Sequence, residues 1–190
     1  ADSVAGFDTG PGNILMDAWI NHHKSCTYDH NGEWACSGLV NQELLSDLLS
    51  LSYFSEPPPK STGREQFNLD WLLSITNKYL STPPQDIQRT LLELTANSIA
   101  DGIKQYVTSH TFELLVCGGG SRNPALVERI QALIPNNEVR ISDYAGINAD
   151  WMEAAAFAWL AMQCLKGSYG NKPNVTGAKG DRILGAIYQA

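Results

Sequence analysis

The chain has 190 residues, 43% of them hydrophobic and 17% charged, and a formal net charge of −7. This composition and length are typical of one compact domain, or one large lobe, with its own core. The acidic balance argues against nucleic acid or an anionic membrane surface as the main partner. No apolar run reaches the roughly 18 residues that a membrane-spanning helix needs.

The first predicted elements form a strand–turn–helix unit. A short strand over Ser3 to Phe7 is followed by the turn DTGPGN, residues 8–13, and by a helix that runs to about Lys24. Gly10 and Gly12 let the backbone approach an anion without Cβ interference. The amides at the helix start add the positive end of the helix dipole. The turn is therefore a candidate phosphate-binding site.

Asp8 is the residue of this turn that phosphate binding alone does not explain, because a carboxylate repels phosphate. It fits there as a metal partner or as a base that collects a proton from an attacking group. The alternative is an ordinary strand–turn–helix junction in which Asp8 caps the turn.

The histidines and cysteines that follow offer a weak metal motif. His22, Cys26 and His30 would share a helix face, as a zinc site requires, if the first helix continued through residue 30. Tyr28 to Gly32 is instead typical of a helix end and a turn, such as that of a small hairpin, so we expect no metal there. Cys117 and Cys164 lie in apolar runs and are expected to be buried, reduced thiols of a cytoplasmic protein.

The middle of the chain is predicted to be helical, with one stiff loop. Consecutive prolines exclude helix from the segment between Glu56 and Arg64, which we expect to be extended. Its plain interpretation is a surface connector. The expected helices are 43 to about 51, capped by Asn41; Asn68 to about Tyr79; and Gln85 to about Thr108, opened by Pro83-Pro84.

A second strand–glycine–helix unit follows. The apolar run Phe112 to Cys117 predicts a buried strand and ends in three consecutive glycines, Gly118, Gly119 and Gly120. Asn123 is expected to cap the next helix, residues 125–134, with Pro124 as its first residue. Three glycines in a row favour a flat or large ligand close to the backbone, such as a base and ribose.

The last predicted elements are a strand from Glu138 to Ser142 and a helix from Asp150 to Leu165. The alanines of that helix suit close contact with a sheet. Strands that alternate with long helices indicate an α/β fold. Glu153 lies in the first helical turn, where the dipole favours a carboxylate, and Asp143 and Asp150 are expected to act as caps.

Several motifs in order resemble the anhydro-N-acetylmuramic acid kinases. These are FDTGPGN followed by LMDAW, PPKSTGREQFN (residues 58–68), CGGGSRNPAL, DWMEAAAFAWLA (residues 150–161) and the closing ILGAIY (residues 183–188). The resemblance implies the C-terminal lobe of an actin-like, ribonuclease H-like ATPase fold, with a mixed sheet flanked by helices, over residues 1–190. The N-terminal lobe of the family, with its own glycine-rich phosphate motif, has no counterpart here.

The resemblance also implies a reaction and its residues. The family uses ATP and Mg²⁺ to open 1,6-anhydro-N-acetylmuramic acid with water and to phosphorylate the released O6, in the recycling of peptidoglycan. Asp8 corresponds to the base, and the sugar would contact Glu153, Lys60 and Arg64. The phosphate motif corresponds to Thr9, Gly10, Gly12 and Asn13, and the adenosine motif to Gly118, Gly119, Gly120 and Asn123.

Other functions share this architecture. An actin-like or chaperone-like ATPase switch has the same fold, and a lobe without its partner could be an inert fragment. The expected ligands are ATP and an amino sugar, with the missing N-terminal lobe as the protein partner, and the sequence leaves a homodimer open.

Overall fold

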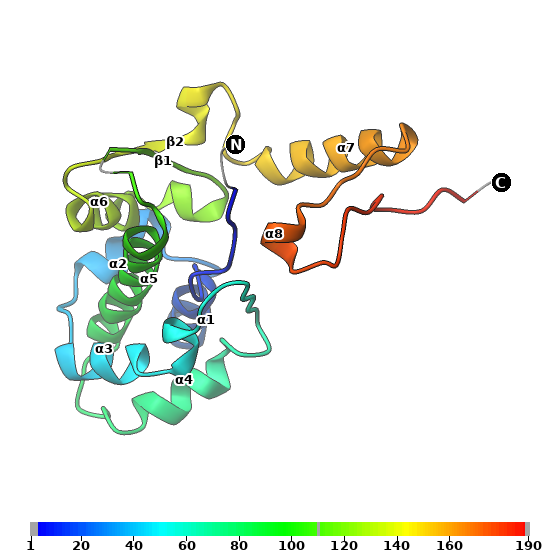
Figure 1. Cartoon of the computed structure of the whole chain (residues 1–190). Helices are drawn as coiled ribbons and strands as arrows, with labels where there is room; N and C mark the ends of the chain where they lie inside the picture. Colours follow the sequence, from blue (N-terminus) through cyan, green and yellow to red (C-terminus); the bar gives the residue numbers. More distant parts are fainter. Residues whose placement is uncertain (1–3, 110, 189–190) are drawn as a thin grey trace.

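The computed structural model describes residues 4–109 and 111–188 (Figure 1). It is mostly helical, with one small sheet. Its elements are α1 (Ile14–Lys24), α2 (Glu33–Cys36), α3 (Gln42–Leu49), α4 (Leu69–Thr76), α5 (Pro84–Tyr106), β1 (Glu113–Val116), α6 (Pro124–Leu133), β2 (Glu138–Ile141), α7 (Met152–Leu165) and α8 (Pro173–Thr176).

Helix α5 is the centre of the core. Figure 1 shows it running through the body of the molecule, where it packs against α1, α2, α3 and α6. Pro84 is its first residue, where the missing amide proton costs nothing. Its buried residues include both apolar and polar side chains, so it is enclosed on several sides. Within the described residues, no helix combines the length and the apolar character needed to cross a membrane.

The predicted caps Asn41 and Asn123 are confirmed, and Asn68, predicted as the first residue of its helix, is a cap as well. The side-chain oxygens of Asn41, Asn68 and Asn123 accept the backbone amides of Leu44, Trp71 and Leu126 at distances of 3.0, 2.9 and 3.2 Å. Each bond satisfies one amide that has no partner inside its helix. These caps fix where α3, α4 and α6 begin.

The sheet differs from the prediction. In the described chain, β1 pairs only with β2, in parallel, with Leu114 opposite Val139 and Val116 opposite Ile141. Helix α6 connects the two strands, as a parallel crossover requires. Strands and helices do alternate here, but the expected mixed sheet is wrong for the described residues.

The predicted first strand is also wrong where the structure describes it. Ser3 lies outside the described residues, and residues 4–7 are extended without strand pairing. A strand needs a neighbour for its backbone groups, and this segment packs on α5 instead. The Phe7 and Tyr106 rings meet edge to face at 4.8 Å, and Gly102 leaves the space that the Thr9 methyl group fills.

After α1, one local expectation, the helix end near Lys24, is confirmed, and another, a small hairpin, is corrected. Helix α1 ends at Lys24, with Ser25 in the left-handed region, so His30 does not share a face with His22. The residues around Asn31 form a 3₁₀ turn rather than a hairpin. Asp29 explains this, because its carboxylate accepts the amides of Trp34 and Ala35, both at 2.9 Å, and so starts α2.

Helix α7 was expected to pack on the sheet, and this is wrong for the structure described. None of its residues is buried, and Figure 1 shows it extending away from the body together with α8 and the C-terminal segment. Cys117 is exposed and Cys164 only half-buried, so the expectation of two buried thiols fails. All four cysteines are free.

An ion pair joins α5 to α6. The buried Glu93 carboxylate accepts two hydrogen bonds from Arg129, at 2.7 and 2.6 Å, and one from Asn97 at 2.9 Å. Burial acts to raise the pKa of Glu93. The hydrogen bonds outweigh burial and hold the pKa below its ordinary value of 4.5.

We predict that Glu93→Gln lowers the free energy of unfolding at pH 7 by about 1–3 kcal/mol, because Arg129 loses its charged partner. Because the pKa of Glu93 is lower in the folded state than its ordinary value of 4.5, the ionised carboxylate stabilises the fold above pH 4.5. This stabilisation is lost as the pH falls through the folded-state pKa. The gap between wild type and variant should therefore narrow below about pH 4.5. Urea unfolding measures it, with the exposed Glu128→Gln as control. If the difference in unfolding free energy stayed the same at low pH, the lowered pKa of Glu93 would be contradicted.

Candidate functional site

The two glycine turns lie against each other. The Asn13 side chain does not cap α1 and reaches the second turn instead. A Cβ added at Gly119 or Gly120 would lie 3.7 or 3.4 Å from atoms of the Asn13 amide. These are ordinary contact distances, so the Asn13 amide lies directly beside the two glycines. The structure therefore brings the expected phosphate and adenosine motifs together at one place.

The glycines of the first turn have different physical roles. A Cβ at Gly10 would lie 2.9 Å from the Ser98 hydroxyl and 3.0 Å from the Phe54 ring, so Gly10 is required for packing. Gly12 has open space around it and a positive φ of 56°, so it is required for the shape of the turn. The Thr95 hydroxyl donates to the Gly12 carbonyl at 2.7 Å and fixes the turn on α5.

A cavity of about 340 Å³ opens beside this contact, and we call it the nucleotide-side cavity. This volume is in the range of small-molecule pockets. Its lining combines both glycine turns with the first turn of α1 and the segment that follows this helix: Asn13, Met16, Asp17, Thr27, Tyr28, Asp29, Gly119, Arg122 and Asn123.

Asp17 gives this cavity a titratable group. Burial is the main cause that raises the pKa of Asp17, to about 6. The nearby charge of Asp29 also raises it, while Arg64 lowers it. Arg64 itself is exposed and lines neither this cavity nor the one described below.

The second turn is held by its own bonds. Gly118 has a φ of 72° and donates its amide to the Ala149 carbonyl at 3.0 Å. Arg122 binds the Asp150 carboxylate with two nitrogens, at 3.2 and 2.5 Å. Asp150 is thus an ion-pair partner rather than a cap. The Asn123 oxygen is engaged in capping α6, which leaves its amide nitrogen for a ligand.

Asp8 faces a different cavity, of about 530 Å³, which we call the acid-side cavity. It lies between the first turn, the proline-rich loop and α8. Its lining residues are Gly6, Phe7, Asp8, Pro59, Lys60, Ser61, Val175 and Thr176. The DTGPGN turn therefore contributes to two cavities, with Asn13 in one and Asp8 in the other.

The Asp8 carboxylate is oriented by the proline-rich loop. Its Oδ2 accepts the Ser61 hydroxyl at 2.8 Å and the Thr62 amide at 2.9 Å. The Asp8 backbone is also tied, because the Tyr53 hydroxyl donates to its carbonyl at 2.7 Å. Asp8 does not cap its own turn through these bonds. They hold one carboxylate oxygen and leave Oδ1 directed to no hydrogen-bond donor among the described residues.

Lys60 lies beside Asp8 but is engaged within the protein. Its Nζ donates to the Tyr53 carbonyl at 2.9 Å and lies 4.7 Å from the Tyr53 ring centre. Burial is the first cause that raises the pKa of Tyr53 to about 12, and the charges of Asp8 and Glu56 add to it. Tyr53 therefore stays a neutral donor.

Glu153 is not brought into the site in this structure. It is exposed in the first turn of α7 and lines neither cavity described above. Sequence reasoning missed three residues that do belong here: Asp17, Ser61 and Thr62. In the sequence, Asp17 was visible only as a single acidic residue within an apolar helix. The other two lie in the PPKSTGREQFN motif, where only the charged side chains were chosen.

We predict that Asp17→Asn raises the melting temperature at pH 7 by a few degrees. Because the folded-state pKa is raised from 3.8 to about 6, the folded state keeps its proton longer than the unfolded state. Wild type therefore loses stability as the pH rises through this window. The asparagine variant does not, so the two melting temperatures should converge near pH 4. Equal melting temperatures of wild type and variant at pH 7 would show that the buried Asp17 charge does not destabilise the fold.

Comparison with known proteins identifies the family of this chain. The family model of anhydro-N-acetylmuramic acid kinase matches residues 1–190. The anhydro-N-acetylmuramic acid kinases of Nitrosomonas europaea and Pasteurella multocida are each 54% identical over 187 residues. These matches cover 98% of this chain and 51% and 50% of the relatives, so the chain spans about half the length of the curated relatives it matches. The chain belongs to the anhydro-N-acetylmuramic acid kinase family.

Proposed function

We propose that this chain supplies the base and the nucleotide-binding turns of an ATP-dependent anhydro-N-acetylmuramic acid kinase. The reaction adds water to the 1,6-anhydro sugar and transfers a phosphoryl group to its O6. The product is N-acetylmuramic acid 6-phosphate, an intermediate in peptidoglycan recycling in the cytoplasm. The proposal rests on family membership and on one observation: Asn13, which shares the DTGPGN turn with Asp8, contacts Gly119 and Gly120 of the second turn.

The acid-side cavity is our site for the anhydro sugar. Asp8 Oδ1 takes a proton from water as the water oxygen bonds to C1 of the sugar. The bond from C1 to O6 breaks, and its electron pair remains on O6. That oxygen then attacks the γ-phosphorus of ATP, and ADP leaves. Ser61 and Thr62 hold the carboxylate in place during the first step.

The DTGPGN turn is our site for the transferred phosphate. Gly12 and Asn13 present backbone at the start of α1, where the helix dipole favours an anion. Such fixed dipoles stabilise charge that moves during phosphoryl transfer. Thr9 and Gly10 shape the turn through their packing on α5. The base and ribose would occupy the nucleotide-side cavity along Gly119 and Arg122.

Magnesium fits this site only in part. A magnesium ion is usually held by one or two carboxylates together with phosphates and water. Among the described residues, no group of three or more acids, histidines or cysteines is arranged to hold a metal, and Asp8 is the only carboxylate that lines the acid-side cavity. Because Asp8 Oδ1 is assigned to the base step, we place the main magnesium ligand in the half of the family protein that this chain does not match, where the metal would neutralise phosphate charge.

The sugar contacts extend beyond Asp8. Lys60 lines the acid-side cavity, and an anion would have to replace its bonds to the Tyr53 and Phe54 carbonyls. Arg64 and Glu153 are exposed and free to approach a ligand when the rest of the protein is present. We propose that full activity needs the half of the family's length that this chain does not match.

Asp8→Asn tests the base. We join this chain to the uncovered half of the Nitrosomonas europaea relative and measure phosphosugar formation. Turnover should fall by at least about 10²-fold, because a general base contributes that much or more. Nucleotide affinity should stay the same. The control is the exposed Asp70→Asn. Near-normal turnover would refute the role of Asp8, and weakened nucleotide binding would indicate a metal ligand instead.

Ser61→Ala tests the orientation of the base. Loss of its hydrogen bond to Asp8 should lower kcat by about 10-fold, since a bond to a charged group contributes roughly 1.5–3 kcal/mol. KM should change little, and Ser61→Thr should restore kcat because it keeps the hydroxyl. Ser74→Ala, whose hydroxyl bonds within α4, is the matched control. A variant with normal kcat would show that Ser61 does not position Asp8.

A further inference from the structure

Asp17 is a titratable group of the nucleotide-side cavity that the proposed reaction does not use. It lies one helical turn after Asn13, and its backbone amide donates to the Asn13 carbonyl at 2.9 Å. Residues four apart share one face of a helix, and both of these residues line the cavity. An anion held at the start of α1 would therefore lie about 6 Å from Asp17.

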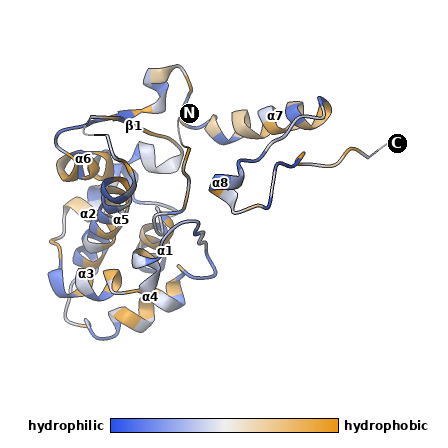
Figure 2. Cartoon of the chain, in the orientation of Figure 1, coloured by the Kyte–Doolittle hydropathy of each residue, from blue (hydrophilic) through white to orange (hydrophobic). Residues whose placement is uncertain are grey.

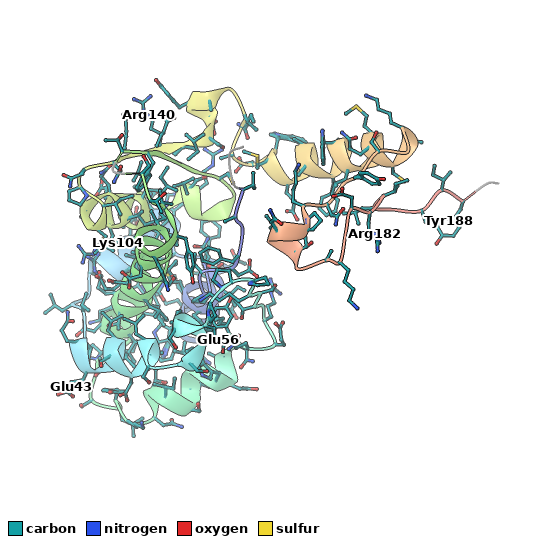
Figure 3. All side chains as sticks on the ribbon, viewed as in Figure 1. Glu43, Glu56, Lys104, Arg140, Arg182 and Tyr188 are labelled. Carbon is teal, nitrogen blue, oxygen red and sulfur yellow. The ribbon has the colours of Figure 1, made fainter. Side chains whose placement is uncertain are left out.

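The packing of α1 fixes Asp17 at this place. Leu15, Met16 and Trp19 of this helix are buried in the core, and Figure 2 shows hydrophobic and hydrophilic residues mixed along it. Figure 3 shows the densely packed side chains of the body, to which α1 belongs, whereas the labelled Arg182 and Tyr188 stand apart on the C-terminal segment. The position of Asp17 therefore does not depend on that segment.

The cavity contains a second acid, and the surroundings of the two acids differ. Asp29 is buried, and its carboxylate accepts the amides of Trp34 and Ala35 and the side-chain nitrogen of Gln88. Asp17 is half-buried, and no described residue donates a hydrogen bond to its carboxylate. When two acids share a site, the one without donors is the better holder of a proton.

The charges around Asp17 add to this difference. Burial, the largest cause, raises the pKa of Asp17 to about 6, while the charge of Arg64 opposes burial and that of Asp29 adds to it. Among the described residues, Arg122 is the only basic one that lines the cavity, and it is already paired with Asp150. No described charged residue of α4 or α5, the helices packed against α1, lines the cavity. Phosphate groups would therefore favour the proton on Asp17 further.

We propose that Asp17 is a nucleotide-binding residue that acts as a neutral carboxylic acid and donates a hydrogen bond to a phosphate oxygen of the nucleotide. This inference rests on the nucleotide site proposed above. A neutral carboxyl group has one O–H donor, so the contact replaces the repulsion between an ionised carboxylate and phosphate. Nucleotide binding then takes up a proton, and by reciprocity a lower pH strengthens nucleotide binding.

The test compares the pH dependence of ADP binding in wild type and Asp17→Asn. ADP is titrated into the ¹⁵N-labelled chains at about pH 5.5 and about pH 8, on either side of the pH at which Asp17 ionises. One phosphate charge about 6 Å away, at an effective dielectric constant of about 40, changes an ionisation constant about tenfold. The Kd of wild type should therefore rise about 5- to 10-fold more between these pH values than that of Asp17→Asn, which cannot ionise.

The control removes the titration of the ligand. ADP itself ionises in this range, and its contribution is the same for every variant, so only the difference between variants is used. Asp70→Asn, at an exposed position of α4, should show the pH dependence of wild type. A second measurement follows the proton directly, because the ¹³C signal of the Asp17 carboxyl group reports its pKa. Saturating ADP should raise this pKa.

Three outcomes would overturn the proposal. The first is the same pH dependence in wild type and Asp17→Asn, or a pKa of Asp17 that ADP leaves unchanged. The second is a pKa that ADP lowers, with weaker binding by Asp17→Asn at pH 8, which would show that ionised Asp17 accepts ribose hydroxyls. The third is ADP that shifts the amides of neither glycine turn. That result would refute the nucleotide site itself, whereas the first two leave it standing.

Discussion

Helix α5 positions both glycine turns, and the candidate site depends on it. One side of the helix holds the first turn through the Thr95 hydroxyl, the close packing at Ser98 and the space left by Gly102. Another side holds α6, which starts at the second turn, through the ion pair of Glu93 with Arg129. Two segments far apart in sequence meet because one buried helix binds each of them.

This arrangement separates two kinds of chemistry. The turn presents backbone amides where an anion can approach, and it places the Asp8 carboxylate in a second cavity beyond. Ser61 and Thr62 orient that carboxylate from a loop that consecutive prolines keep extended. In the proposed function, the base and the phosphate site would therefore lie at opposite ends of the DTGPGN turn, which keeps their like charges apart. Helix α7 lies outside this arrangement, and none of its residues is buried.

The sequence predicted the local features well and the non-local ones less well. Asparagine caps and the start of α5 at Pro84 depend on neighbouring residues, and they were confirmed. The strand at residues 4–7 failed because a strand needs a pairing partner, which no local pattern supplies. The prediction that α7 packs on the sheet failed because such packing also depends on residues distant in sequence. Asp17 was missed because its raised pKa arises from burial and charges that only the fold brings together.

The most direct test of the central claim is to map nucleotide onto the ¹⁵N-labelled chain by NMR, which detects weak binding. The account predicts that ADP shifts the amides of Asn13, Gly119 and Gly120 together and leaves those of Ser61 and Thr62 nearly unchanged. Shifts in one turn without the other, or shifts centred on the acid-side cavity, would contradict a nucleotide site built from both turns.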